Sequence, residues 1–409
     1  MAQSEFKVYR VRWLMLTVYM LIIAANQLLW ITFAPVTGDA AKYYGVSDLK
    51  IGLLSMCFMV VFILFSIPAS WIIDKYGIRI GVGIGALLTG VFGLLRGFTG
   101  TNYNLLLLAQ TGIAVGQPFI LNAITKMAAR WFPIEERATA AGLGTMAMYV
   151  GILAGMTVTP FLTMSFGIDK MLDIYGIISI ITAFIFIVLI KEGPPTAPCR
   201  PDQEERSLVF DGFKQTVRTK DFIWLMIIFF IGLGVFNSVT TWIEDILRPR
   251  GFSATQAGIT GGLMIVGGVI GAMIIPILSD RRKKRIPFII LALIGSTIGL
   301  AGITFATNYW ILLVSGAVLG FFLLSSGPIG FQYGAEITFP ASEGTSNGML
   351  LLMGQISGIA FIFGMDSFKS AVNGSMTRSL ILMIALMVLS IIMSFRLKES
   401  TILSGEKEL

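Results

Sequence analysis

Histidine is absent from the 409-residue sequence, and both cysteine and charge are scarce. Without histidine the chain lacks the commonest proton shuttle and the commonest ligand for a metal or haem iron. The two cysteines, Cys57 in an apolar run and Cys199 in a polar stretch, are too few for a disulfide framework or a zinc site. Charged residues make up only 13% of the chain, which excludes an ordinary soluble globular protein. We therefore expect no cofactor and no metal site.

Apolar residues dominate instead, at 55% of the chain with a mean hydropathy of +0.83. This composition predicts an integral membrane protein. A hydrocarbon core about 30 Å thick needs roughly 20 helical residues, and twelve apolar runs of about that length are separated by charges or turn signals. The predicted spans are 13–36, 50–73, 79–98, 104–128, 138–164, 171–191, 221–246, 256–279, 287–306, 310–334, 345–366 and 376–396.

The longest polar stretch, 192–220, contains KEGPPTAPCRPDQEER, whose prolines cannot continue a helix. It predicts an N-terminal six-helix bundle at 1–191, a linker at 192–220 and a C-terminal six-helix bundle with a short tail at 221–409. If the N-terminus is cytoplasmic, more than two thirds of the 30 Lys and Arg fall on the side of the termini and linker. The positive-inside rule then predicts a multi-pass cell-membrane protein with both termini cytoplasmic. The net charge of +7 is explained by topology, so no nucleic-acid partner is expected.

The two halves repeat each other at a separation of 206 or 207 residues. GVSDLKIG from Gly45 recurs as GFSATQAG from Gly251, and TNY at 101–103 recurs at 307–309. These matches fall in topologically equivalent loops. They predict a duplicated six-helix unit of parallel orientation, the arrangement of major facilitator transporters.

Candidate gating residues also follow the repeat. Asp74 and Arg79 lie in SWIIDKYGIR, and Asp280 lies in the degenerate second copy, PILSDRRKKR. Glu136 and Glu343 are matched in the same way. An aspartate at a helix end can pair with an arginine and with a neighbouring helix terminus, a contact that can hold one gate shut. The alternative is a surface ion pair of little energetic value.

Charge is nearly absent from the centres of the predicted spans, so no mid-membrane carboxylate is available as a proton carrier. This favours a facilitator, or uniporter, over a proton-driven pump. Gln117 and Gln355 are the central polar residues of their spans, and Pro118 weakens the backbone ladder beside Gln117. For each glutamine the alternative is an interhelical hydrogen bond.

Trp30 lies nine residues before Asp39, about 13 Å deep if the helix is continuous, and follows the amides Asn26 and Gln27. Its repeat mate, 207 residues on, is Asn237. An aromatic face attracts a cation by about 0.5–2 kcal/mol, and amides can receive a polar tail. Trp30, Asn26 and Asn237 are therefore candidate substrate-binding residues together with the two glutamines. The alternative is an interfacial tryptophan with packing amides.

Four stretches, YYGVSDLKIGLLSM, GQPFILNAITKMAARWF, GVFNSVTT and AEITFPASEGTSNG followed by GQISGI, resemble the feline leukaemia virus subgroup C receptor family of the major facilitator superfamily. The resemblance covers roughly residues 20–165 and 221–370. It implies a transporter of choline and ethanolamine, with haem export an older assignment for the family. Haem is disfavoured here because no histidine is available to ligate iron.

The resemblance also implies that Trp30, Gln117 and Gln355 belong to a choline site. The fourth family position is a tyrosine, which is Asn237 here. Losing that ring removes one wall of an aromatic cage and favours a primary amine or another polar solute.

We predict an alternating-access, monomeric transporter of a small polar or cationic metabolite, embedded in a lipid bilayer. One alternative is ion-coupled transport of an organic anion, which needs a buried cation such as Arg96 or Lys126. Another is a membrane receptor without transport. An enzyme is not expected, because no nucleophile, base and orienting group converge.

Overall fold

The computed structural model describes residues 8–196, 218–338 and 343–399, and every regular element in these ranges is a helix. The contacts divide the chain into two compact units, residues 1–206 and 207–409. Ten helices of the described residues are long and apolar enough to cross a membrane. The prediction of an all-α membrane protein is thereby confirmed. Most of the predicted linker lies outside the described residues.

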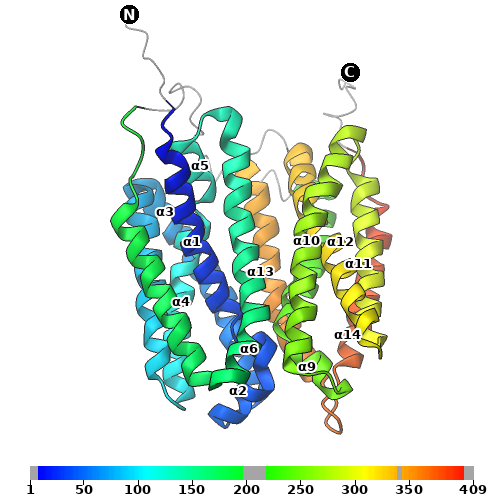
Figure 1. The fold of residues 1–409 in the computed structure, drawn as a ribbon. Coiled ribbons are helices and arrows are strands. Elements are labelled where there is room, and N and C mark those ends of the chain that lie inside the picture. The colour runs from blue at the N-terminus through cyan, green and yellow to red at the C-terminus, as the bar shows by residue number, and fades with distance from the viewer. Residues whose placement is uncertain (1–7, 197–217, 339–342, 400–409) are drawn as a thin grey trace, which may run out of the picture. The chain divides into compact units, whose positions relative to one another are not determined.

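Unit 1 is built from helices that run along one another, with α1 packed against both α6 and α4 (Figure 1). Its elements are α1 (Val11–Ile31), η1 (Ala34–Val36), α2 (Thr37–Tyr44), α3 (Asp48–Leu95), η2 (Arg96–Phe98), α4 (Tyr103–Leu121), α5 (Ile124–Trp131) and α6 (Ile134–Leu189).

Two helical stretches of unit 1 are far longer than one membrane crossing. Asp48–Phe98 and Thr139–Leu189 hold 51 residues each, or about 75 Å, whereas the hydrocarbon core is about 30 Å thick. Each contains one glycine outside helical geometry, Gly77 at φ +87° and Gly167 at φ +82°. Positive φ is unfavourable for residues with a Cβ atom. Each stretch therefore consists of two helical segments joined at a glycine, close to where the sequence predicts a boundary.

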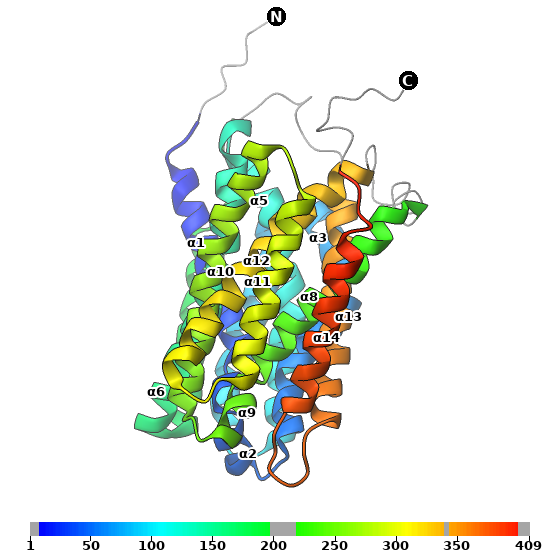
Figure 2. The same ribbon diagram turned by 90° about the vertical axis from the view of Figure 1, so that its right-hand side faces the viewer.

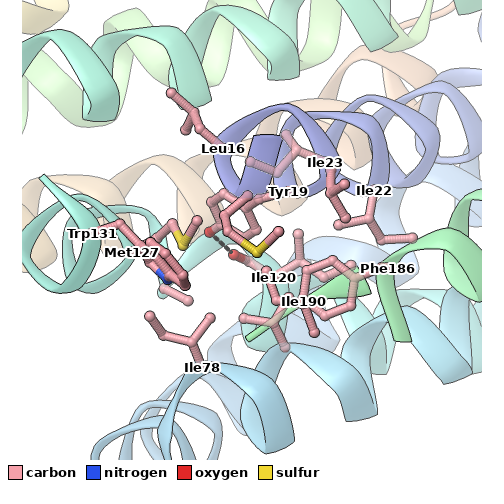
Figure 3. Close-up of a cluster of buried hydrophobic side chains, with 14 of the residues drawn as sticks. Leu16, Tyr19, Ile22, Ile23, Ile78, Ile120, Met127, Trp131, Phe186 and Ile190 are labelled. Atoms are coloured by element: carbon pink, nitrogen blue, oxygen red, sulfur yellow. Dashed lines mark hydrogen bonds between the residues drawn. The ribbon is translucent and has the colours of Figure 1, made fainter. Parts of the chain in front are cut away.

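The core of unit 1 is an apolar cluster held by one polar contact. The hydroxyl of Tyr19 in α1 donates to the carbonyl of Ile120 in α4 at 2.5 Å, among the side chains of Met127, Trp131 and Phe186 (Figure 3). The hydroxyl is thus satisfied inside an environment where an unpaired polar group is costly. This contact fixes α1 beside α4.

Unit 2 has α8 packed against α13 and α14 (Figure 2). Its elements are α8 (Lys220–Thr241), α9 (Ile243–Leu247), η4 (Arg248–Arg250), α10 (Ala254–Arg282), α11 (Ile286–Phe305), α12 (Tyr309–Thr338), α13 (Glu343–Ser367) and α14 (Thr377–Ser394).

The first predicted span, 13–36, lies within the membrane-length stretch Val11–Tyr44, in which α1 ends at Ile31 and the chain continues through η1 into α2. Trp30 therefore lies in the last turn of α1, and the depth expected from a continuous helix to Asp39 does not apply. The span predicted at 104–128 is also interrupted, because α4 ends at Leu121 and α5 begins at Ile124.

Candidate functional site

Trp30 is held against α3 by its indole. Its Nε1–H donates to the carbonyl of Ser55 at 3.1 Å, and only 7% of the residue is exposed. The N–H is thus used within unit 1, while the ring face needs no hydrogen-bond partner. Any ligand contact made by Trp30 would be through that face, as a cation–aromatic interaction requires.

Asn26 lies one turn before Trp30 on α1 and is fully buried. Its Nδ2 donates to Thr89 Oγ1 at 3.0 Å and to the carbonyl of Ile113 at 3.5 Å, and its Oδ1 accepts from Gln27 Nε2 at 3.3 Å. These contacts join α1 to α3 and α4. They give Asn26 a helix-packing role, and its assignment as a substrate-binding residue stays a prediction.

Gln117 lies on α4 beside a close backbone contact with α3. A Cβ atom added to Gly116 would lie 2.7 Å from the carbonyl oxygen of Gly85, and one added to Gly85 would lie 2.7 Å from the carbonyl oxygen of Gly116. Gln117 is 6% exposed, and its amide has no hydrogen-bond partner among the described residues. Buried amides are normally hydrogen-bonded, so this one is free for a ligand or water.

Pro118 does not interrupt α4. The helix continues past it to Leu121, and the break lies between Leu121 and the start of α5 at Ile124. Asn122 lies at the break, and its Nδ2 donates to Ser66 Oγ and Ser70 Oγ, each at 3.0 Å, on α3. These bonds join the break after α4 to α3.

Unit 2 brings Asn237 and Gln355 together. Asn237 Nδ2 on α8 donates to the carbonyl of Gly354 on α13 at 3.1 Å. Because a carbonyl can only accept, this bond fixes the amide orientation and leaves Oδ1 as an acceptor without a donor among the described residues. Gln355 follows directly, is half-buried, and has no hydrogen-bond partner in the described ranges. In unit 1, Trp30 and Gln117 lie on the neighbouring helices α1 and α4.

The sequence suggested an ion pair between Asp74 and Arg79, but the partner of Asp74 is a different residue. Its carboxylate accepts from Lys126 Nζ at 3.1 Å, and Lys126 also donates to the carbonyl of Ile73 at 2.6 Å. The backbone N–H of Arg79 instead donates to Glu192 Oε2 at 2.9 Å. The reason is geometric: Gly77 breaks the helix between Asp74 and Arg79, so the two side chains do not share a helix face.

Asp280 belongs to a larger network in unit 2. It pairs with Arg285, whose Nη2 also contacts Glu336 Oε1 at 2.9 Å. Burial would lower the pKa of the Arg285 guanidinium, but its hydrogen bonds to Glu336 and Asp280 raise the pKa above the ordinary value. Glu399 accepts from the backbone N–H of Arg285 and of Ile286, both at 3.0 Å.

Glu136 forms a two-point ion pair with Arg12, at 3.0 and 3.1 Å, that joins the start of α6 to α1. Its predicted repeat mate, Glu343, has a side chain outside the described residues. Both gating assignments remain predictions.

Arg96 is fully buried in unit 1. Its Nη1 donates to the carbonyl of Leu29 at 3.2 Å and to Gln110 Oε1 at 2.8 Å, and Gln110 Nε2 donates to the same carbonyl at 3.2 Å. The pair thus binds the C-terminal turn of α1, next to Trp30. No carboxylate pairs with Arg96 in the described part of the chain. A helix C-terminus offsets about 2 kcal/mol at most, less than the several kcal/mol that burying a cation costs.

Comparisons with known proteins agree with this architecture. A family model described as the Major Facilitator Superfamily matches residues 15–362. The chain is 30% identical over 380 residues to solute carrier family 49 member A3 of Xenopus tropicalis, covering 88% of this chain and 78% of that protein. It is 27% identical over 378 residues to the choline/ethanolamine transporter FLVCR2 of Homo sapiens, covering 88% and 72%.

A solved structure has a similar fold. The bacterial homologue of the human lysosomal transporter Spinster, in an inward-facing and unoccupied conformation, superposes with a TM-score of 0.77. The match covers 98% of this chain and 100% of that chain at 16% identity, so it shows the fold alone.

Proposed function

Because the chain belongs to the major facilitator superfamily and, within it, to the feline leukaemia virus subgroup C receptor family, we propose that it transports a small polar or cationic metabolite resembling choline or ethanolamine. Transport is downhill, since the apolar spans offer no central carboxylate for proton coupling. The substrate class is supported by the relatives of Danio rerio and Homo sapiens, which are named choline/ethanolamine transporters.

The observation that carries the proposal is the pair of unpartnered glutamines. Gln117 on α4 and Gln355 on α13 lie in apolar, membrane-length helices without hydrogen-bond partners among the described residues. Neither amide is sealed inside the protein, so both are available to a solute, and polar side chains in membrane spans usually face the bundle interior or a water-filled cavity. The proposed binding set is Trp30 and Gln117 from unit 1 with Asn237 and Gln355 from unit 2. The indole face receives the cation, and the amides receive a hydroxyl or an N–H group.

The proposed topology has twelve spans, with both termini cytoplasmic. The glycine breaks at Gly77 and Gly167 support it, because each divides a stretch of 51 residues that is too long for one crossing. The ion pairs Asp74–Lys126 and Asp280–Arg285 are the proposed gates, which break and form as the bundles rock.

An organic anion is a weaker alternative. It requires a cation that the substrate can reach, whereas Arg96 is fully buried and Lys126 is paired with Asp74. A receptor without transport is the remaining alternative, and it predicts no uptake of any solute.

Uptake of labelled choline and ethanolamine into proteoliposomes tests the proposal. We expect uptake without an ion gradient, reduced about tenfold or more by Gln117→Leu or Gln355→Leu, because each removes a hydrogen bond to the solute. Asn104→Leu, which also replaces an amide with leucine but at an exposed position on α4, is the control and should leave uptake intact. Absence of uptake by stable wild-type protein would reject the function, and normal uptake by both variants would reject the glutamines as ligands.

A further inference from the structure

Four consecutive cations lie at the turn between α10 and α11. They are Arg281, Arg282, Lys283 and Lys284, and all four residues are exposed. Their side chains form no ion pair in the described part of the chain. Arg282 is drawn toward α11, with its Cζ 6.0 Å from the centroid of the Phe288 ring, a contact that leaves its charge in place. The 281–284 cluster is therefore an accessible patch of positive charge.

The carboxylates beside this cluster are engaged by the next residue, Arg285. Asp280 and Glu336 form ion pairs with its guanidinium, and Glu399 accepts from its backbone N–H. Three acidic side chains thus contact one arginine, while the four cations before it keep their excess charge. An anionic partner for the cluster must come from outside these contacts.

The backbone at Lys283 gives an independent reason to look for such a partner. Lys283 has φ +51°, a conformation that glycine adopts without steric cost, and its repeat mate in unit 1 is Gly77. The dipole of α10 favours cations near its C-terminus. It gives no reason to place lysine where the backbone favours glycine. The charge of Lys283 is the property that offsets this cost.

The cluster joins two membrane-length apolar helices, α10 and α11. Arg281 follows Ile277 by four residues and Leu278 by three, so it lies on the same face of α10 as those side chains. An acidic phospholipid combines acyl chains for such an apolar face with a phosphate for the cations. Exposed apolar side chains occur at helical spacing on both helices: Ile274, Ile277 and Leu278 on α10, and Leu291, Ile294 and Ile298 on α11.

We propose that the 281–284 cluster binds the headgroup of an anionic phospholipid from the surrounding bilayer. The turn lies at the end of unit 2 where α14 ends, since Glu399 contacts it (Figure 2). In the topology proposed above this end is cytoplasmic, the side on which anionic lipids attract basic segments that flank a span. The four equivalent positions of unit 1, residues 75–78, carry one cation, Lys75. The inference goes beyond the proposed substrate and does not depend on it.

Native mass spectrometry of the purified full-length protein in neutral detergent tests the site. Phosphatidylglycerol and phosphatidylcholine with identical acyl chains are titrated separately, and we expect phosphatidylglycerol to bind about tenfold more tightly or better. Glycerol 3-phosphate, which lacks acyl chains, should not displace the bound lipid at equal concentration. Equal binding of the two lipids would overturn the proposal. Displacement by glycerol 3-phosphate would overturn it too, because the site would then belong to a soluble phosphate.

A double variant, Arg281→Gln with Arg282→Gln, assigns the effect to the cluster. Each cation near the membrane surface contributes about fivefold, so phosphatidylglycerol should bind about 25-fold more weakly. Arg10→Gln with Lys75→Gln is the matched control, because it removes two exposed cations from unit 1 and changes the net charge equally. It should keep the preference for phosphatidylglycerol. Equal losses in both double variants would reduce the effect to net charge and overturn the site.

Lys283→Gly separates the charge from the backbone. Glycine suits the positive φ, so the unfolding midpoint should stay the same or rise, whereas the affinity for phosphatidylglycerol should fall about fivefold. A purely structural lysine would not change lipid affinity. Unchanged affinity in this folded variant would contradict the proposal, and the variant decides the question if the double variant of the arginines does not fold.

Discussion

Unit 1 and unit 2 place an aspartate at the same point of their repeat but surround it differently. Both aspartates are largely exposed, with 59% of the Asp74 side chain and 64% of the Asp280 side chain accessible, and Asp74 pairs with Lys126. Asp280 pairs with an arginine whose side chain is 7% exposed and which also binds a Glu336 side chain of equal burial. The repeat therefore preserves the position of the aspartate but not its partners. Opening the pair in unit 2 separates Asp280 from an arginine that Glu336 holds in place, whereas the pair in unit 1 can open at little cost.

The backbone at the same point has a positive φ in both units. Gly77 has φ +87° and ψ 179°, and Lys283, its repeat mate, has φ +51° and ψ 39°, the one positive φ among the non-glycine residues described. After each break, a glutamate accepts hydrogen bonds from the start of the next helical segment: Glu192 from Arg79, and Glu399 from Arg285 and Ile286. Duplication has thus retained the helix ends while the charged partners diverged.

Arg285→Gln should show the largest effect in this comparison. The buried Glu336 carboxylate then keeps its hydrogen bond from Gln332 but loses its ion pair with Arg285. We therefore expect the free energy of unfolding to fall by about 3–5 kcal/mol. Lys126→Gln, the corresponding change in unit 1, should cost about 0–1 kcal/mol because Asp74 is solvated. Denaturant unfolding in detergent measures both. Equal losses would remove the distinction between the units.

The helix-start glutamates should give smaller, similar effects. Glu192→Ala, at a half-buried position, and Glu399→Ala, at an exposed one, each remove an acceptor from a helix N-terminus, and each should cost about 0.5–1.5 kcal/mol. Amide hydrogen exchange should quicken at Arg79 in the first variant and at Arg285 and Ile286 in the second. Faster exchange in only one unit would show that the two glutamates are not equivalent.

Much of the fold was predictable because apolar run length and glycine placement are local signals. The break at Gly77, the membrane class and the family follow from residues in sequence order. The glutamates Glu192 and Glu399 were missed, although their separation of 207 matches the repeat and offered a usable signal.

The hydrogen-bond and ion-pair partners of the side chains were harder to predict from the sequence. The hydrogen bonds of Asn26 to Thr89 and to the carbonyl of Ile113, both distant in sequence, could not be predicted. Lys126 as the partner of Asp74, and the burial of Arg96, depend equally on how helices pack. Such contacts are set by tertiary geometry, which hydropathy does not encode.

The central claim is that Trp30 provides an aromatic face for the transported cation, and uptake by Trp30→Ala tests it most directly. Trp310→Ala is the control, because Trp310 is 74% exposed on α12. We predict that Trp30→Ala lowers choline and ethanolamine uptake at least tenfold while keeping a normal unfolding transition, and that Trp310→Ala transports normally. Undiminished uptake by folded Trp30→Ala would contradict the account.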